Sequence, residues 1–539
     1  MNTPAVAKHP HENGDDLADP KHVKSREKFS KRAKTQRRRA LNHDEDKDTE
    51  SSARDLKAPR LRKRMCALLI GYCGSGYRGL RFQYDGTSTI ESTLFSALVR
   101  AGAISEDNAD DPDKVNFARA SRTDAGVHAA GNLISLKMIT QVPGVPDVTG
   151  RINEELPPGI RLWEYIRVQN SFNPRTLCDS RKYTYFFPSY LLLPPKPTSE
   201  LYRVLTEHAA SLSLPSPIAA HPFWAAAGAG EGADSPTTAP SEEGVHCTDI
   251  QRKRAWRVGT AQMEQLRTAA QRYLNTHNFH NFTLNGVFTE RSYERNMKDI
   301  VIADPVVYGQ TEWISVMFHG QSFMMHQIVG LSQRQPLVPR LISPHSLIEE
   351  LYGPGAVIIP KMPALGLLLE QPIFDSYNTK LEGANAKLLA PTHTHTDFRP
   401  PIDFSVHREE MEAFKARYIY ENMRMVEERD GLFDAWIRMV DAYAGTDLLY
   451  LNPKGTIPPA AVMKNNDRNS WSREGAFVEA KRFNATSFPV PGQVEGVAGG
   501  QEVSQEGGWG GDRAVFDFCG MADDGYGKRE GKLNTSIQQ

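Results

Sequence analysis

Apolar positions along this chain recur with two different periods, and each change of period marks the boundary of an element. The run C-A-L-L-I-G-Y at 66–72 is apolar almost throughout, which predicts a buried strand. Apolar residues three and four positions apart then predict a helix, which ends where Gly102 supplies a stop. Ser88 and Glu91 have the spacing of a capping box at its start. The apolar face of this helix comprises Ile90, Leu94, Ala97, Leu98 and Ala101.

Later segments repeat the same alternation of strand and helix patterns. Short apolar runs at 133–136 and 313–317 predict strands, and the alternation at 183–186 predicts a strand whose two tyrosines share one face. A second helical pattern, Met263, Leu266, Ala270, Tyr273 and Leu274, precedes residue 277. Strand, helix and further strands in this order predict an α+β fold, with helices against a mixed sheet.

Changes in composition divide the chain of 539 residues into six segments. We expect a charged, disordered tail, a first ordered half, an insertion rich in loops, a second ordered half, a helical extension and a disordered Gly-rich and Pro-rich tail. Within the extension, helical spacing is rough and runs from about 405 to 443. The expected boundaries are 1–62, 63–191, 192–257, 258–376, 377–452 and 453–539.

Composition excludes several classes of protein. The apolar fraction is ordinary, the net charge is −1, and no apolar run is long enough to cross a membrane. The first 20 residues lack the apolar core of a secretory signal. The five cysteines form no C-x-x-C pair, which argues against a zinc cage or a disulfide framework and favours a reducing compartment.

The near-neutral net charge hides a basic N-terminal arm. Residues 21–39 are dense in Lys and Arg, an acidic run follows at 44–50, and a second basic cluster lies at 60–64. Such an arm is a candidate nuclear-import signal or phosphate-binding tail, with a solvated tail that has no partner as the alternative. Acidic residues near the start disfavour a mitochondrial leader, although a mitochondrial location stays open.

The candidate chemistry centres on S-R-T-D-A-G-V-H-A-A-G at 121–131. Asp124 lies between Arg122 and a small turn, ahead of the strand predicted at 133–136. A carboxylate on a tight loop that leads into a strand is rigidly held and suits an acid, a base or a nucleophile. On spacing alone, a surface Asx turn explains the same residues.

The glycine-rich segment G-S-G-Y-R-G at 74–79 formally matches a dinucleotide-binding fingerprint. That fingerprint requires a helix to begin at its last glycine. Residues 80–84 instead indicate extended chain, and Asp85-Gly86 indicates a turn. We therefore reject a dinucleotide site.

Taken together, these motifs resemble the TruA family of tRNA pseudouridine synthases. R-T-D-A-G-V-H at 122–128 matches the core of that family's catalytic signature without a substitution, and Y-C-G-S-G-Y-R-G at 72–79 resembles its first loop. H-N-F-H-N-F-T at 277–283, S-F-M-M-H-Q-I at 322–328 and P-A-L-G-L-L-L-E at 363–370 resemble the eukaryotic, multisite-specific branch.

The resemblance implies a fold and a reaction. The fold would be two ferredoxin-like halves, whose mixed or antiparallel sheets join around a central cleft with helices on the outer face. The reaction would be the isomerisation of tRNA uridines without a cofactor or a metal. It implies tRNA as the partner, other RNAs being possible, and leaves the oligomeric state and the modified positions open.

The resemblance also assigns roles to individual residues. Asp124 would act at the ribose anomeric carbon, and Arg122 would fill the gap left by the everted base or bind a flanking phosphate. Tyr183, in the family's R-x-Y-x-Y pattern, would stack on the target base. The alternative interpretation is that the two tyrosines of this strand simply pack in the hydrophobic core. Further candidates for RNA contact are Arg175, Lys137, Arg181, Lys182 and His326.

Two features of the C-terminal motifs leave more than one functional interpretation open. The histidines at 277 and 280 have a spacing found in metal sites, but no third ligand with suitable spacing follows, so we expect no metal. Family members continue H-Q-I-R-K-M-V-G, whereas this chain has Val329 after H-Q-I, which removes the basic partner expected for Asp124. Arg334 and Arg340 are the candidate substitutes. A catalytically weakened tRNA-binding protein or folding helper is thus the second hypothesis, and an unrelated Asp-dependent hydrolase the third.

Overall fold

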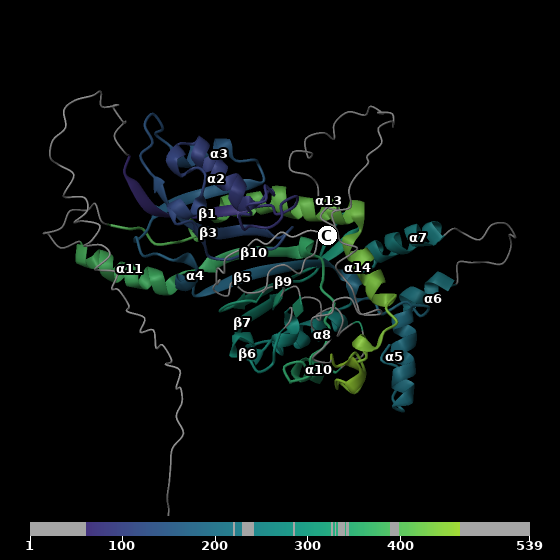
Figure 1. The fold of residues 1–539 in the computed structure, drawn as a ribbon. Coiled ribbons are helices and arrows are strands. Elements are labelled where there is room, and N and C mark those ends of the chain that lie inside the picture. Colours follow the sequence, from purple (N-terminus) through teal and green to yellow (C-terminus); the bar gives the residue numbers. More distant parts are fainter. Residues whose placement is uncertain are drawn as a thin grey trace, which may run out of the picture. The chain divides into compact units, whose positions relative to one another are not determined.

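A computed structural model describes residues 61–218, 221–228, 242–283, 286–324, 327–328, 330–331, 340, 344–388 and 398–463. Within these residues the chain forms a ten-stranded mixed sheet with the order β4-β1-β3-β10-β5-β9-β7-β6, in which β2 and β8 pair with β3 and β9 (Figure 1). The strands are β1 (Lys63–Tyr72), β2 (Ala118–Arg119), β3 (His128–Ile139), β4 (Ile160–Arg167), β5 (Ser180–Pro188), β6 (Asn275–Asn278), β7 (Glu294–Ile302), β8 (Val306–Tyr308), β9 (Thr311–Gly320) and β10 (Leu367–Ile373). The predicted α+β class is confirmed.

Helices follow or separate the strands along the chain. The N-terminal ones are α2 (Ile90–Arg100), α3 (Val148–Glu155) and α4 (Pro174–Leu177). The middle of the chain adds α5 (Glu200–Ser211), α6 (Pro222–Gly228), α7 (Glu242–Ala255), α8 (Thr260–Gln271) and α10 (Ser346–Glu350). The C-terminal ones are α11 (Asp375–Leu388), α12 (Arg408–Phe414), the π-helix η9 (Lys415–Tyr420), α13 (Glu421–Asp430) and α14 (Leu432–Asp441). None of the helices in the described part of the chain combines the length and apolar character that a membrane crossing requires.

The sheet interleaves segments that are far apart in the sequence. Strand β10 lies between β3 and β5, parallel to β3 and antiparallel to β5. Strands from the two predicted halves therefore belong to one continuous sheet and interleave, because β10 lies between β3 and β5, and β5 also pairs with β9. The first part of β5 and the start of β3 both pair with the short strand β10, which brings the segments around Asp124 and Tyr183 together.

The predicted helix after the glycine-rich loop is present, but its capping residues differ from those expected. Thr89, not Ser88, is the N-cap of α2, and its partner in the capping box is Ser92. Glu91 is buried instead: it accepts a hydrogen bond from the Phe82 backbone N–H at 2.8 Å and pairs with Arg119 at 2.5 Å. The helix ends as predicted, because Gly102 follows the C-cap with φ +75°, a conformation that suits glycine.

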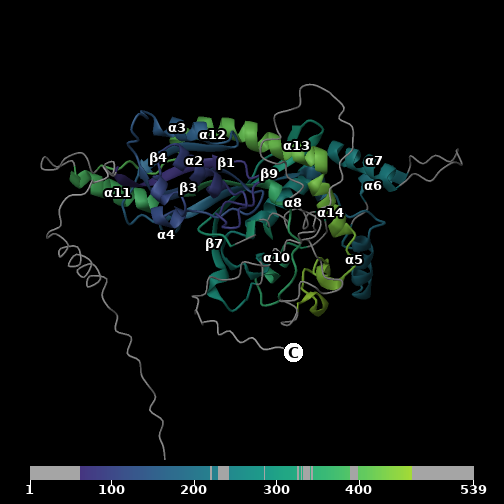
Figure 2. The ribbon, with the colours of Figure 1, turned by 45° about the horizontal axis from the view of Figure 1, so that its top comes forward.

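The C-terminal helical segment lies along the sheet. The predicted helical stretch 405–443 contains α12, η9, α13 and α14, and Figure 2 shows α12 beside α3 at the end of the sheet where β4 lies. Phe414 of α12 packs edge-to-face on Trp163 of β4, with 5.4 Å between ring centroids, and Tyr420 of η9 packs on Phe186 of β5. This segment thus covers one face of β4, β10 and β5.

Candidate active site

The loop that carries Asp124 is a tight turn held by the backbone. Asp124 is half-buried, the Val127 N–H donates to the Asp124 carbonyl at 3.2 Å, and Gly126 adopts φ +77°. Strand β3 begins directly after this turn, at His128. The turn is closed by backbone groups, so the Asp124 side chain is not required to hold it as it would in an Asx turn.

The glycine-rich segment at 74–79 supports this turn by close packing. A Cβ atom on Gly74 would lie 2.1 Å from the Val127 carbonyl oxygen, and one on Gly79 would lie 2.9 Å from that of Thr123. The Leu80 N–H also donates to the Thr123 carbonyl at 3.0 Å. The glycines are needed because two backbone segments meet here, and α2 begins only at Ile90, as the rejection of a dinucleotide site predicts.

Buried hydrogen bonds fix the residues on either side of Asp124. The Tyr72 hydroxyl lies 2.8 Å from the Thr123 hydroxyl. The Asn132 side-chain amide donates to Tyr72 at 3.2 Å and to the Ser121 carbonyl at 3.1 Å. These polar groups have few alternatives away from water, so the network holds the loop rigidly.

His128, the last residue of the motif, is buried and has a structural role. Its Nδ1 accepts a hydrogen bond from the Gly74 backbone N–H at 3.1 Å, so the proton of the neutral ring lies on Nε2. Burial lowers the pKa of His128 to about 4, which keeps the ring neutral at physiological pH. His128 therefore joins the two loops and is not available as a general acid.

Tyr183 and Arg181 reach the Asp124 loop from β5. The Arg181 guanidinium donates through Nε to the Ser121 hydroxyl at 2.9 Å and through Nη2 to the Ala120 carbonyl at 2.9 Å. Tyr183 lies on the same face as Arg181 and is buried, with the ring of Phe323 packed edge-to-face 5.2 Å away.

The electrostatics of Tyr183 show how close the two segments are. Burial raises the pKa of Tyr183 to about 12; Arg181 and a hydrogen bond with Ser121 oppose this rise, and the Asp124 carboxylate adds to it. The Tyr183 phenol is therefore neutral across the physiological range. The structure brings Asp124, Ser121, Arg181 and Tyr183 into one cluster.

Tyr185 fits the alternative interpretation, in which a tyrosine of this strand packs in the hydrophobic core. Its ring is fully buried, and its hydroxyl donates to the Pro363 carbonyl at 2.5 Å. Tyr183 and Tyr185 lie on the same face of β5 but have different surroundings, because Tyr183 lies beside the Asp124 loop whereas Tyr185 lies in the core.

The remaining predicted site residues are scattered around this cluster. Arg122 is exposed on the loop itself, and Arg175 is exposed on α4. Lys182 lies on the sheet face opposite to Tyr183, because neighbouring residues of a strand alternate. Lys137 lies nine residues along β3 from His128, about 30 Å at the rise of a strand.

Two further expectations concern the motif at 322–328. His326, Val329 and Arg334 lie outside the described residues. Arg340, the other candidate substitute for the missing cation, is buried and donates to the Leu193 carbonyl and, at 2.5 Å, to Asp441. Arg340 therefore does not replace that cation: the candidate was wrong because its guanidinium is held among the C-terminal helices.

The histidine-rich motif at 277–283 has a structural role in the described chain. His277 lies 2.7 Å from the Leu274 carbonyl and stacks on Tyr352, with 4.2 Å between ring centroids. Asn281 donates to the carbonyls of Leu351 and Gly355 at 2.9 and 2.8 Å. Among the described residues, no three His, Cys, Asp or Glu side chains are grouped as metal ligands would be.

Sequence reasoning missed the residues that join the cluster. Ser121 lies directly before the R-T-D-A-G-V-H core and accepts from Arg181, and Phe323 lies in S-F-M-M-H-Q-I and contacts Tyr183. Phe323 had a signal, because it belongs to a motif that the family shares. Ser121 had none, since its partner is 60 residues away in the chain.

Comparisons with known proteins show which class of enzyme and which family this chain resembles. No protein-family model matches the chain. The tRNA pseudouridine synthase 1 of Candida glabrata is 40% identical over 413 residues, which are 72% of this chain and 72% of that protein. The Saccharomyces cerevisiae tRNA pseudouridine synthase 1 is 40% identical over 413 residues, 72% of this chain and 73% of that protein. The tRNA pseudouridine(27/28) synthase of the same yeast is 33% identical over 347 residues, 58% of this chain and 85% of that protein.

Such similarity, joined to the α+β sheet and the loop at 121–131, defines a pseudouridine synthase of the TruA type. The chain belongs to the family of the eukaryotic tRNA pseudouridine synthase 1 proteins. This confirms the family that the motifs predicted.

Proposed function

We propose that this protein isomerises uridines of tRNA to pseudouridine, with Asp124 as the catalytic carboxylate and Tyr183 as the side chain that stacks on the target base. The observation that carries the proposal is the cluster of Asp124, Ser121, Arg181 and Tyr183. The Asp124 carboxylate contributes to the raised pKa of Tyr183, which supports a role for both groups at one nucleotide. The names of the relatives supply the substrate class.

The reaction breaks the N1–C1′ bond of uridine and forms a C5–C1′ bond, so its atoms balance without a co-reactant. Asp124 has two chemically reasonable roles: attack on C1′, or removal of a proton from the ribose. Both require a carboxylate held at a fixed place beside the sugar. The backbone turn at 124–127 and the buried hydrogen bonds of Thr123 and Asn132 support such a placement.

The side chains around Asp124 have separate roles in this proposal. A neutral Tyr183 offers an aromatic surface to the everted base, which typically contributes about 1–3 kcal/mol without demanding a base sequence. Arg181 positions the Asp124 loop through Ser121 and Ala120. Arg122, exposed on the loop, fills the space left by the base or binds a flanking phosphate.

The test is to incubate the full chain with an unmodified tRNA transcript and to map pseudouridine. We expect product with the wild-type chain, none with Asp124→Asn, and normal product with the control Asp113→Asn, an exposed carboxylate of the 3-10 helix Pro112–Val115. Tight tRNA binding without product would favour the folding-helper hypothesis, and a released base would favour hydrolysis. Either result would refute the proposed reaction.

We also propose a nuclear location, on the strength of the basic residues at 21–39. That segment lies outside the described residues. Residues 1–62 fused to a fluorescent reporter should concentrate it in the nucleus, and replacing Arg37, Arg38 and Arg39 by alanine should abolish this. Accumulation in mitochondria would favour the alternative location.

A further inference from the structure

A buried hydrogen bond joins the C-terminal helical segment to the glycine-rich loop that supports the Asp124 turn. The Ser75 hydroxyl donates to the Asn422 Oδ1 at 2.5 Å, and the two residues are only 7% and 8% exposed. Ser75 follows β1, whereas Asn422 belongs to α13, 347 residues further along the chain. Buried polar groups that lose their partner stay unsatisfied, so such a bond holds its two segments firmly together.

The loop around Ser75 is in turn tied to the Asp124 turn by backbone groups. The Gly126 N–H donates to the Tyr77 carbonyl at 3.4 Å, and the Tyr77 N–H donates to the Gly74 carbonyl at 3.1 Å, which closes the loop around Ser75. The Gly74 N–H also donates at 3.1 Å to the side chain of the first residue of β3. A displacement of Ser75 is therefore transmitted to the turn, because the two backbone segments are in close contact.

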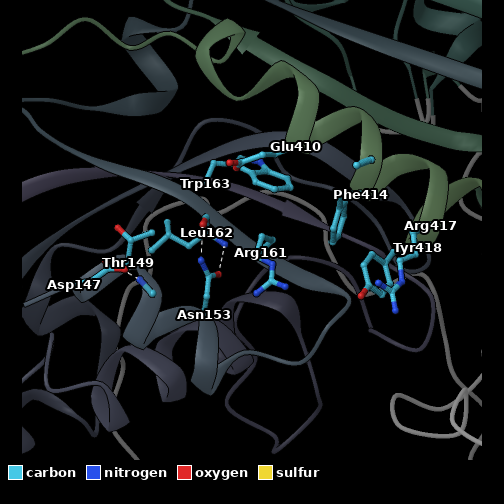
Figure 3. A pocket seen from close by; sticks show the side chains of 12 residues that line it. Asp147, Thr149, Asn153, Arg161, Leu162, Trp163, Glu410, Phe414, Arg417 and Tyr418 are labelled. Atoms are coloured by element: carbon cyan, nitrogen blue, oxygen red, sulfur yellow. Dashed lines mark hydrogen bonds between the residues drawn. The ribbon is translucent and has the colours of Figure 1, made fainter. Parts of the chain in front are cut away.

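The segment that carries Asn422 is anchored to the rest of the fold on both sides of that residue. Before it, Phe414 of α12 packs edge-to-face on Trp163 of β4, as Figure 3 shows. After it, the Glu427 carboxylate accepts from the Tyr190 hydroxyl at 2.5 Å. Since the helical segment is held at both places, Asn422 offers the Ser75 loop a fixed support.

The π-helix η9 keeps Asn422 on the buried side of this segment. In a regular α-helix of about 3.6 residues a turn, Asn422 would be rotated by about 80° from Phe414. The wider turns of η9, between these two residues, reduce that rotation. Buried positions accordingly recur every four residues along the segment, at Met411, Lys415, Ile419, Met423 and Glu427, and beside them at Phe414, Asn422 and Val426.

We propose that Asn422 is a positioning residue for the isomerisation, which acts through Ser75 on the turn that carries Asp124. The inference rests on the proposed function, because it assigns a further residue to the same reaction. Each step from Asn422 to the turn is a hydrogen bond or a close backbone contact between described residues. The C-terminal helical segment thereby takes part in catalysis, although it contributes no residue to the cluster around Asp124.

The test compares two substitutions at position 422 in the full chain. Asn422→Leu keeps the approximate size of the side chain and removes its acceptor, whereas Asn422→Asp keeps an acceptor oxygen. Single-turnover rate constants at saturating enzyme, and dissociation constants, are measured with an unmodified tRNA transcript. We expect Asn422→Leu to lower the rate constant about ten-fold with an unchanged Kd for tRNA, because the carboxylate is displaced while the RNA contacts remain. Asn422→Asp should keep most of the wild-type rate.

Asn385→Leu is the matched control. Asn385 of α11 is also 8% exposed, and its side-chain amide donates to the Arg399 carbonyl at 2.7 Å. Helix α11 follows β10 at the end that leads away from the Asp124 turn, because β10 runs parallel to β3. We expect Asn385→Leu to lower the denaturant midpoint of unfolding and to leave the single-turnover rate constant unchanged. An equal loss of rate in this control would show a merely structural effect and overturn the inference.

A third comparison tests whether Asn422 acts through Ser75. Ser75→Ala should lower the rate constant about as much as Asn422→Leu, and the double variant should lose little more, since both substitutions remove one hydrogen bond. Ser75→Ala also provides the test on its own if Asn422→Leu does not fold. Losses that multiply in the double variant would overturn the inference, and so would weaker tRNA binding with a wild-type rate. Wild-type protein that yields no pseudouridine refutes the proposed function, whereas product formed at wild-type rates by both single variants refutes only this inference.

Discussion

At the scale of single residues, the candidate site depends on one guanidinium that links strand β5 to the loop carrying Asp124. Arg181 projects from β5 and donates to Ser121 and Ala120 of the loop that carries Asp124. A family member would place a different basic residue directly after the motif at 322–328, where this chain has Val329. Arg181 is thus a cation among the described residues that can hold the loop carrying Asp124.

The first prediction concerns Arg181. Arg181→Ala should lower kcat about 10- to 100-fold with little change in KM, because the Asp124 loop loses two hydrogen bonds and a small displacement of a catalytic group is costly. Single-turnover kinetics on tRNA measure this effect. Lys182→Ala, from the opposite face of the same strand, should leave kcat unchanged. A larger effect of Lys182 than of Arg181 would refute the proposed role.

The second prediction separates the ring of Tyr183 from its hydroxyl. Tyr183→Phe should keep activity within a few-fold of wild type, since the ring supplies the stacking surface, whereas Tyr183→Ala should lose about 1–3 kcal/mol of base binding. Because the pKa of Tyr183 is raised to about 12, ionisation of this phenol should not limit activity below about pH 11. The pH dependence of the single-turnover rate tests this, and an alkaline loss near pH 10 that Tyr183→Phe abolishes would contradict it.

At the scale of elements, the sheet is linked to the C-terminal helices by a buried ion pair. Glu370 of β10 accepts from the Thr184 hydroxyl of β5 at 2.6 Å and pairs with Lys415 of η9 at 3.1 Å. The Lys415 amine is largely buried, and although burial opposes its charge, the Glu370 carboxylate raises its pKa. The π-helix begins at Lys415, where it changes the rotation of the helix between α12 and α13.

The third prediction follows from this link. Lys415→Met should lower the free energy of unfolding by about 3–5 kcal/mol, because it leaves the Glu370 carboxylate partly buried without its cation. Adding Glu370→Gln should restore much of the loss, since the partly buried side chain is then uncharged and the other partner of Lys415, Glu412, is exposed to solvent. Denaturant unfolding of the single and double variants measures both effects. If the two substitutions simply add, the pair is not coupled.

At the scale of the whole molecule, a buried carboxyl joins the end of the sheet to the last helices. Glu427 of α13 accepts from the Tyr190 hydroxyl, beyond β5, at 2.5 Å and from the Phe433 N–H of α14 at 2.9 Å. Burial raises the pKa of Glu427 to about 7, opposed by these two hydrogen bonds. The folded chain therefore binds a proton here more tightly than the unfolded chain does.

The fourth prediction is a pH dependence of stability. A raised carboxyl pKa gives stability that is fully present below the unfolded value of 4.5 and is lost as pH rises through about 7. This group should therefore remove roughly 3 kcal/mol between pH 4.5 and 8. Glu427→Gln should flatten that part of the stability profile, whereas Glu428→Gln, on the exposed side of α13, should not. Parallel profiles for Glu427→Gln and wild type would contradict the prediction.

The sequence by itself determined the local elements and the turn that carries Asp124. The apolar run of β1, the left-handed stop at Gly102 and the turn at 124–127 depend on neighbours in the chain, so their patterns predict them. The capping residues of α2 were shifted by one position because Thr89 and Ser92 satisfy the same backbone groups that Ser88 and Glu91 were expected to satisfy.

Only the tertiary structure decided which of these residues meet. Arg181 contacts Ser121 across 60 residues, and Thr184 contacts Glu370 across 186, because β10 is inserted between β3 and β5. A pattern along the chain records which side chains share a face of one element, whereas the pairing of distant strands depends on the free energy of the whole sheet.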